Sequence, residues 1–159
     1  MINIFNNFNK LVSDSVLKLA KSCEIEVSKD AISKIVVEPT KNSKHGDLAT
    51  NAAMVCKNSF QSHFNNPRQL AEKIIETIKE NKEQKLNDKI VKIEIAGPGF
   101  INFFISNQLY QEIGSELLDS GTFSFENIGN KEKINLEYAS PNPTGPIHIG
   151  HTRGSIYGD

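Results

Sequence analysis

A proline-rich segment near the C-terminal end limits the folds open to this chain more than any other feature. The segment "SPNPTGPIHIG", residues 140–150, contains three prolines. Proline fixes φ and lacks a backbone donor, so neither a helix nor a central strand can run through it. The residues before it, "INLEYA" from Ile134, predict a strand, and those from His148 onward predict a helix. Strand, tight loop and helix N-terminus is how a nucleotide-binding α/β sheet begins.

Two histidines stand at the start of the predicted helix. His148 and His151 are three residues apart and therefore share one face of its first turn. A helix N-terminus presents free N–H groups and the positive end of the macrodipole, which favours anions. The alternatives are a chance pair or half of a metal site, but a metal needs further ligands, and the two cysteines form no C-x-x-C pair. We therefore expect a phosphate site here and no metal site.

The first 120 residues have the periodicity of a separate mixed domain. Asn66, Pro67 and Gln69 suit the N-cap, first and third positions of one helix. The periodicity predicts four helices, over 4–23, 48–58, 67–81 and 107–120, and three strands, over 34–39, 90–96 and 100–105.

Three finer expectations follow from the same residues. Asp47 is placed to cap the helix over 48–58, and Ser106 to cap the last helix. Val91, Ile93 and Ile95 alternate and should share one strand face.

The bulk composition and the N-terminal residues indicate the class of protein and its cellular location. With 38% hydrophobic residues, 23% charged residues and a net charge of −1, the chain reads as a globular protein without a strongly basic footprint. The N-terminal apolar run is too short for a signal peptide or a membrane span, so we expect a cytoplasmic protein. We divide the chain into an α+β domain over 1–120, a connector over 121–133 and the start of a second domain over 134–159.

The motifs resemble one family. His148-Ile149-Gly150-His151 matches the HIGH signature of class I aminoacyl-tRNA synthetases, and the longer run "EYASPNPTGPIHIGHTRG" resembles the arginyl-tRNA synthetases. "HGDLATNAA" and "IEIAGPGFINFFIS" look like the N-terminal appended domain of that family. The resemblance implies that residues 134–159 begin a Rossmann-like α/β catalytic domain, and that the chain corresponds to about the first quarter of such an enzyme.

The resemblance also implies an activity. Members of this family activate arginine with ATP, for which we expect Mg²⁺ to accompany the nucleotide, and then transfer arginine to the 3′ end of tRNA(Arg). We expect a monomeric enzyme when the protein is full-length. These 159 residues alone should be inactive, because the rest of the catalytic sheet and a second, lysine-rich signature loop are missing.

Individual roles carry over by matching positions. His148 and His151 would stabilise the ATP phosphates, and Gly150 would keep the helix start open for the nucleotide. Arginine would contact Glu137, Ser140, Asn142 and His148. The whole signature region comprises Pro141, Asn142, Pro143, Thr144, Gly145, Pro146, Ile147, His148, Ile149, Gly150 and His151.

The appended domain of the family contacts the outer corner of tRNA. Lys41, Lys44 and His45 form a small basic loop that could take part. Phe100, Asn102 and Phe104 share a strand face and could stack a base, although aromatic residues on strands more often belong to a core.

Two other functions remain open from the residues alone. One is a nucleotidyltransferase with an H-x-G-H phosphate site, although such a box usually lies near the start of a chain. The other is a non-catalytic tRNA-binding module formed by the first domain.

Overall fold

The computed structural model describes residues 3–81, 86–120, 131–137, 140, 145–146 and 148–158. The chain divides into two units, residues 1–123 and residues 124–159. Each unit is described by itself.

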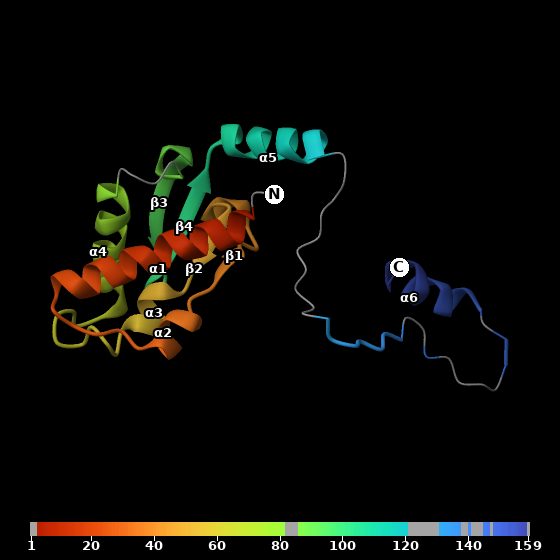
Figure 1. Ribbon diagram of the computed structural model, residues 1–159, viewed down its shortest axis with the longest axis horizontal. Helices are drawn as coiled ribbons and strands as arrows, with labels where there is room; N and C mark the ends of the chain where they lie inside the picture. The colour runs from red at the N-terminus through yellow and green to blue at the C-terminus, as the bar shows by residue number, and fades with distance from the viewer. Residues whose placement is uncertain are drawn as a thin grey trace. The chain divides into compact units, whose positions relative to one another are not determined.

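Unit 1 is built on a four-stranded antiparallel sheet (Figure 1). Its strands are β1 (Val37–Pro39), β2 (Leu48–Thr50), β3 (Ile90–Ala96) and β4 (Phe100–Ile105), in the order β1-β2-β4-β3. The predicted hairpin is confirmed as β3 and β4. Gly97 and Gly99 in its turn have φ of +53° and +149°, which non-glycine residues rarely adopt.

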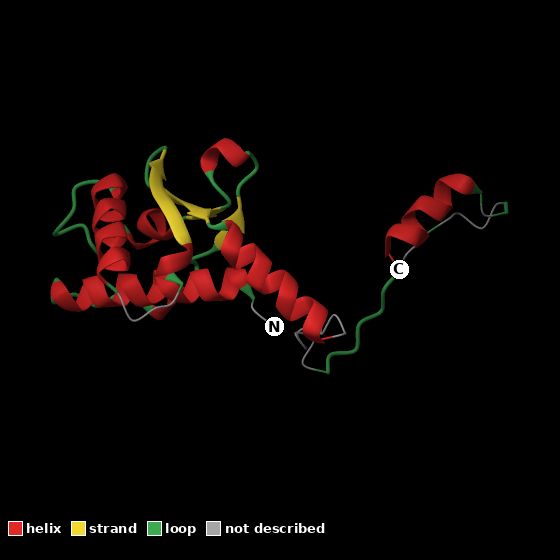
Figure 2. Ribbon diagram, turned by 90° about the horizontal axis from the view of Figure 1, so that it is seen from above, coloured by secondary structure: helices red, strands yellow, loops and turns green. Residues whose placement is uncertain are grey.

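The described part of unit 1 contains five α-helices and two short 3₁₀ turns. They are α1 (Ile4–Ser22), α2 (Lys29–Ser33), α3 (Ala52–Cys56), α4 (Pro67–Glu80), α5 (Asn107–Ser120), η1 (Ser43–His45) and η2 (Asn87–Lys89). Helices α1, α3 and α4 pack on one side of the sheet, which Figure 2 shows from above. The core lies between these two layers. There the rings of Phe8 and Phe103 meet edge to face, with their centres 5.2 Å apart.

Local sequence explains α4 well. The Gln69 N–H donates to the Asn66 side chain (2.9 Å), and Pro67 occupies the first turn, as predicted. The Gln69 side chain accepts from the Asn65 N–H (3.0 Å), one residue earlier than in a capping box. The apolar stripe of Leu70, Ile74 and Ile78 is buried.

The expected helix over 48–58 is wrong in its first half. Residues 48–50 form β2, and only Ala52–Cys56 are helical. Asp47 is therefore not a helix cap: its Oδ2 accepts a hydrogen bond from the Ile105 N–H (2.7 Å). The unit gains a fourth strand because Leu48 and Thr50 pair with Phe103 and Ile101 of β4.

Two other local expectations also fail. The Ser106 hydroxyl is buried without a hydrogen-bond partner and does not cap α5. The pairing of β3 with β4 shifts between Ile90 and Lys92, which leaves Val91 as an extra residue that is 71% exposed. Val91 therefore does not share the buried face of Ile93 and Ile95, because the bulge interrupts the alternation before it reaches them.

Unit 2 contains one described helix, α6 (Ile149–Gly158). The strand expected from Ile134 is not formed at residues 132–137. Ile134 and Leu136 are 73% and 66% exposed there. A strand needs a neighbour to complete its backbone hydrogen bonds, and the described residues of unit 2 supply none.

Candidate functional site

The side of the sheet opposite α1 presents a mixed aromatic and polar surface. Phe100, Asn102 and Phe104 alternate with the core residues of β4 and therefore point away from the helices. Residues opposite them on β3 are Ala96, Glu94 and Lys92, and Ala49 of β2 lies opposite Asn102. No α-helix of the described residues packs on this side, which we call the open face.

Asn102 forms the floor of the open face. It is 5% exposed, and its carboxamide makes no hydrogen bond with any described residue. Its neighbour across the sheet toward β1 is Ala49. Among the described residues, the buried polar atoms without a partner are Thr50 Oγ1, Asn87 Oδ1 and Ser106 Oγ. The amide atoms of Asn102 are not in this group, so they are not sealed in the core and can offer a donor pair and an acceptor to a ligand.

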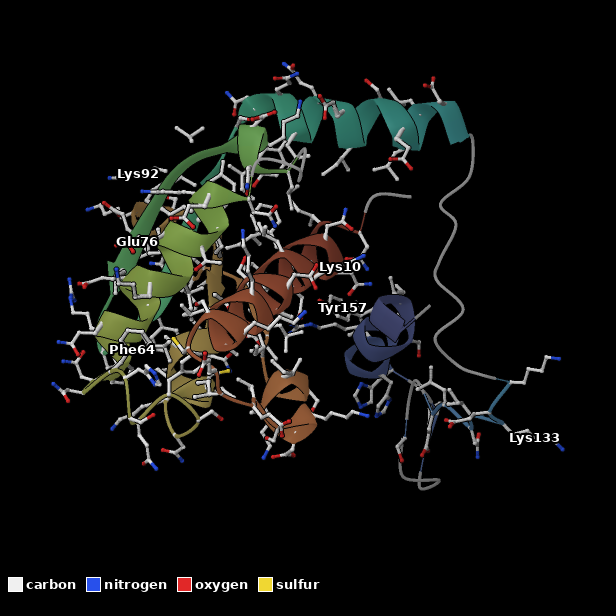
Figure 3. All side chains as sticks on the ribbon, turned by 60° about the vertical axis from the view of Figure 1, so that its left-hand side comes forward. Lys10, Phe64, Glu76, Lys92, Lys133 and Tyr157 are labelled. Carbon is white, nitrogen blue, oxygen red and sulfur yellow. The ribbon has the colours of Figure 1, made fainter. Side chains whose placement is uncertain are left out.

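Aromatic rings flank Asn102 along the strand. Phe100 is 39% exposed, and Phe104 is partly buried. The Lys92 ammonium lies 5.1 Å from the centre of the Phe104 ring and 2.5 Å from the Glu94 carboxylate. Figure 3 shows Lys92 on the outer side of β3, away from α1. The predicted sheet face is thus partly open to a planar ligand, with a polar group between two rings.

The predicted basic loop lies beside this face. Lys41, Lys44 and His45 are all exposed, and the loop ends at Gly46, next to the Phe104 ring. Asn51, between β2 and α3, makes two hydrogen bonds with the backbone. It accepts from the Val36 N–H (3.0 Å) and donates to the Lys34 carbonyl (3.2 Å), so it ties α2 and β1 to α3.

In unit 2, the structure brings the two predicted histidines together. The rings of His148 and His151 lie with centres 3.9 Å apart at the start of α6, and the His151 N–H donates to the His148 carbonyl (2.9 Å). The Gly150 N–H contacts His148 Nδ1 (3.1 Å), and the His148 N–H contacts His151 Nδ1 (3.3 Å). The Nδ1 atom of each ring thus accepts a hydrogen bond from a backbone N–H group at the helix start.

Gly150 is required for this arrangement. A Cβ at this position would lie 2.9 Å from His148 Cε1 and 3.1 Å from its Nδ1. The space that glycine leaves is therefore taken by the His148 ring, whereas we expected it to stay open for a nucleotide. A phosphate that binds the helix start would have to displace this ring, which is exposed and free to rotate into another rotamer.

The other predicted site residues of unit 2 are described only in part. Glu137 and Ser140 are exposed, and no hydrogen bond or ion pair joins either of them to a histidine among the described residues. Gly145 and Pro146 are exposed as well. Residues 141–144, which include Asn142, and residue 147 lie outside the described residues.

Several other kinds of site find no support in the described part of the chain. No group of three or more metal-ligating side chains is present there. Burial raises the pKa of the Cys56 thiol to about 11, so it stays protonated and unreactive at neutral pH. Among the described helices, none has the length and apolar character needed to cross a membrane.

Comparisons with known proteins identify the chain. A family model described as "Arginyl tRNA synthetase N terminal domain" matches residues 6–105. The arginine–tRNA ligase of Rhodopseudomonas palustris (strain HaA2) is 45% identical over 129 residues, which cover 80% of this chain and 20% of the relative. The corresponding ligase of Bartonella henselae is 41% identical over 163 residues, covering 99% of this chain and 26% of the relative.

A solved structure agrees with the fold. The crystal structure of arginyl-tRNA synthetase from Plasmodium falciparum matches with a TM-score of 0.61 at 24% identity, over 100% of this chain and 27% of that chain. The chain thus spans about a quarter of the length of its relatives. On the strength of the family model and the sequence matches, the chain belongs to the arginyl-tRNA synthetase family and carries its N-terminal domain.

Proposed function

We propose that the whole protein is an arginine–tRNA ligase, in which unit 1 binds tRNA(Arg) and the helix start of unit 2 binds ATP. The observation that carries the catalytic part is the histidine pair at the start of α6, where each Nδ1 atom accepts a hydrogen bond from a backbone N–H group. Its sequence, His148-Ile149-Gly150-His151, gives no support to a nucleotidyltransferase once the N-terminal domain is assigned to the arginyl family.

The proposed reaction has two steps. A carboxylate oxygen of arginine attacks the α-phosphorus of ATP, the bond from that phosphorus to the bridging oxygen of pyrophosphate breaks, and arginyl-adenylate forms. Arginine then passes to the 3′ end of tRNA, and AMP leaves. Negative charge builds up on the phosphate oxygens in the first step, so donors fixed at the helix start lower its barrier. His148 and His151 supply such donors, and Mg²⁺ would arrive with the nucleotide.

The histidine role is tested in the whole protein by His151→Ala. Losing one preorganised donor to a transition state typically costs about 10²–10³ in rate. We expect pyrophosphate exchange to slow by that factor, with a smaller change in arginine affinity. The matched control is His63→Ala, since His63 is an exposed residue of unit 1 outside both candidate sites. A loss that appears only as weaker arginine binding would contradict the assignment.

Glu137 is proposed to hold the guanidinium group of arginine. Its carboxylate is exposed and makes no ion pair with a described residue, and a carboxylate can accept paired hydrogen bonds from a guanidinium. Ser140 and Asn142 are proposed to contact the same substrate. Glu137→Gln should weaken arginine binding by about 2–5 kcal/mol while ATP binding changes little. An unchanged arginine affinity would remove Glu137 from the site.

For tRNA binding, we propose that an unpaired base lies on the open face. A base ring would stack on Phe100, and its edge would hydrogen-bond with the unpartnered carboxamide of Asn102. Phe100→Ala should weaken binding of a tRNA(Arg) transcript by about 1–3 kcal/mol. Phe5→Ala is the matched control, because Phe5 on α1 is exposed to a similar degree, 41% against 39%. Equal effects of the two substitutions would contradict the proposal.

The remaining expectations stay proposals. We place the protein in the cytoplasm as a monomer. The 159 residues alone should show no pyrophosphate exchange, because a pocket that buries most of a ligand cannot be formed by one helix start. Exchange by this chain on its own would overturn that proposal.

A further inference from the structure

The loop between β1 and β2, residues 40–46, is held in one conformation by its own hydrogen bonds. The Thr40 N–H donates to the Asp47 carbonyl (3.0 Å), and the Gly46 N–H donates to that of Ser43 (3.1 Å). The Asn42 side chain accepts from the Lys44 N–H (3.0 Å) and so caps η1. The Thr40 hydroxyl donates to the Gly46 carbonyl. A loop of seven residues closed by this many bonds keeps little conformational freedom to lose on binding.

The loop is also fixed to β4. The Asp47 N–H donates to the Phe103 carbonyl (2.8 Å), and the Asp47 carboxylate accepts from the Ile105 N–H (2.7 Å). Burial, then the charge of the Asp47 carboxylate and a hydrogen bond with it, raise the pKa of Tyr110 on α5. Asp47 therefore joins the end of the loop to both β4 and α5.

Gly46 sets how closely the loop approaches the open face. A Cβ here would lie 2.7 Å from the Phe103 carbonyl oxygen and 3.3 Å from Cδ2 of Phe104, and its φ is +84°. Only glycine permits this contact. The backbone of the loop thus lies directly beside the Phe104 ring, at the opposite end of the β4 face from Phe100.

The cations of this loop have no anionic partner in the described structure. The ion pairs there are Asp30–Lys34, Lys73–Glu76, Lys89–Glu112 and Lys92–Glu94. Lys41 and Lys44 are exposed and take part in none of them, and the one carboxylate of the loop end, Asp47, is already occupied. In single-stranded RNA, phosphates alternate with bases. The two free ammonium groups of the rigid loop suit the phosphates, and the aromatic surface beside it suits the bases.

We propose that residues 40–46 form a phosphate-binding loop, in which Lys41 and Lys44 hold backbone phosphates of the unpaired tRNA segment whose base lies on the open face. Phe100 and Phe104 are four residues apart, about 13 Å along the strand. A strand of RNA that runs along β4 from Phe100 would therefore pass Phe104 and reach the loop. The inference rests on the proposed tRNA-binding role of the open face, and it assigns the loop a separate, sequence-independent share of the affinity.

The test compares charge removal at two places. Lys41→Ala/Lys44→Ala removes the two loop cations, and Lys10→Ala/Lys18→Ala removes two exposed lysines of α1, which lies on the other side of the sheet (Lys10 is labelled in Figure 3). Binding of a fluorescent tRNA(Arg) transcript to the 159-residue chain is measured between about 50 and 200 mM salt. Each lost phosphate contact lowers the slope of log K against log salt by about 0.7 for a single strand, so the loop variant should lose about 1.4.

The outcomes separate this inference from the function on which it rests. A lower salt slope in the loop variant alone supports the inference. If Phe100→Ala weakens binding but the loop variant keeps the original slope, the inference is wrong and the open face still binds tRNA. Equal slopes in the loop and α1 variants also overturn it, because the attraction is then unspecific. If neither Phe100→Ala nor the loop variant changes binding, both proposals fail.

Discussion

Two polar side chains of unit 1, Asn102 and Thr50, form no side-chain hydrogen bond with a described residue, and the consequences differ. The Asn102 carboxamide lies on the open face, where a ligand can reach it. The Thr50 hydroxyl has no partner either, but it is 1% exposed and sits on the core side of β2, opposite Val37 and Ile101. An unpaired hydroxyl in a core costs stability and can gain nothing from a ligand.

We therefore expect Thr50→Val to stabilise the protein. Valine keeps the branched shape and removes the unpaired hydroxyl, which should raise the free energy of unfolding by about 1 kcal/mol. The control is Thr77→Val, since the Thr77 hydroxyl donates to the Lys73 carbonyl (2.9 Å) and that bond would be lost. Urea unfolding of both variants checks the prediction. A stability loss in Thr50→Val as large as that in Thr77→Val would contradict it.

For single residues, the sequence predicted which side chains share a face better than it predicted what surrounds each side chain. The alternation of β4 placed Phe100, Asn102 and Phe104 on one face, and the i, i+3 spacing placed His148 beside His151. The neighbour of Asn102 across the sheet is Ala49, which the chain brings opposite it only through the pairing of β2 with β4. No local pattern around Asn102 carries that information.

At the scale of elements, local and distant interactions compete for the same residues. Residues 48–50, Leu-Ala-Thr, precede a run of good helix formers, and propensity favours a helix through all of them. Pairing with β4, more than fifty residues later, makes them a strand instead. Helix α4 needed no such partner, because its caps and apolar stripe lie within its own sequence, and it was predicted closely.

Two glycines give a test of how elements meet. Gly46→Ala should lower the free energy of unfolding by about 1–3 kcal/mol, because alanine at a φ of +84° is strained and its Cβ collides with the Phe103 carbonyl. Gly114→Ala in α5 should raise it by up to about 1 kcal/mol, since nothing lies within 4 Å of that Cβ and alanine favours a helix. Thermal unfolding measures both changes. Equal changes would mean that the loop does not approach β4 closely.

At the scale of the whole molecule, the two units differ in what they bury. Every residue of the described hydrophobic core lies between Phe8 and Leu109. In unit 2, Ile149 and Ile156 are 90% and 73% exposed. The strand expected from Ile134 could not be predicted correctly from its own alternation, because a strand depends on neighbours. The boundaries at 120 and 133 stay a prediction.

Removing residues 124–159 should therefore leave unit 1 unchanged. We expect the shortened chain to keep the urea midpoint and the denaturant m-value of the 159-residue chain, because the described part of unit 2 contributes no core residue. Urea unfolding followed by far-ultraviolet circular dichroism provides the measurement. A lower midpoint in the shortened chain would show that unit 2 stabilises unit 1, and would remove the basis for treating them separately.

The bulge at Val91 has a consequence for how the length of this domain can vary. In β4, adding or deleting one residue would exchange its two faces, moving the phenylalanines of the open face inward and Ile101 outward. In β3, the extra residue already lies outside the regular pairing, before Ile93 and Ile95 enter the core. Insertions and deletions among relatives should therefore be tolerated at Val91, whereas β4 should keep a constant length.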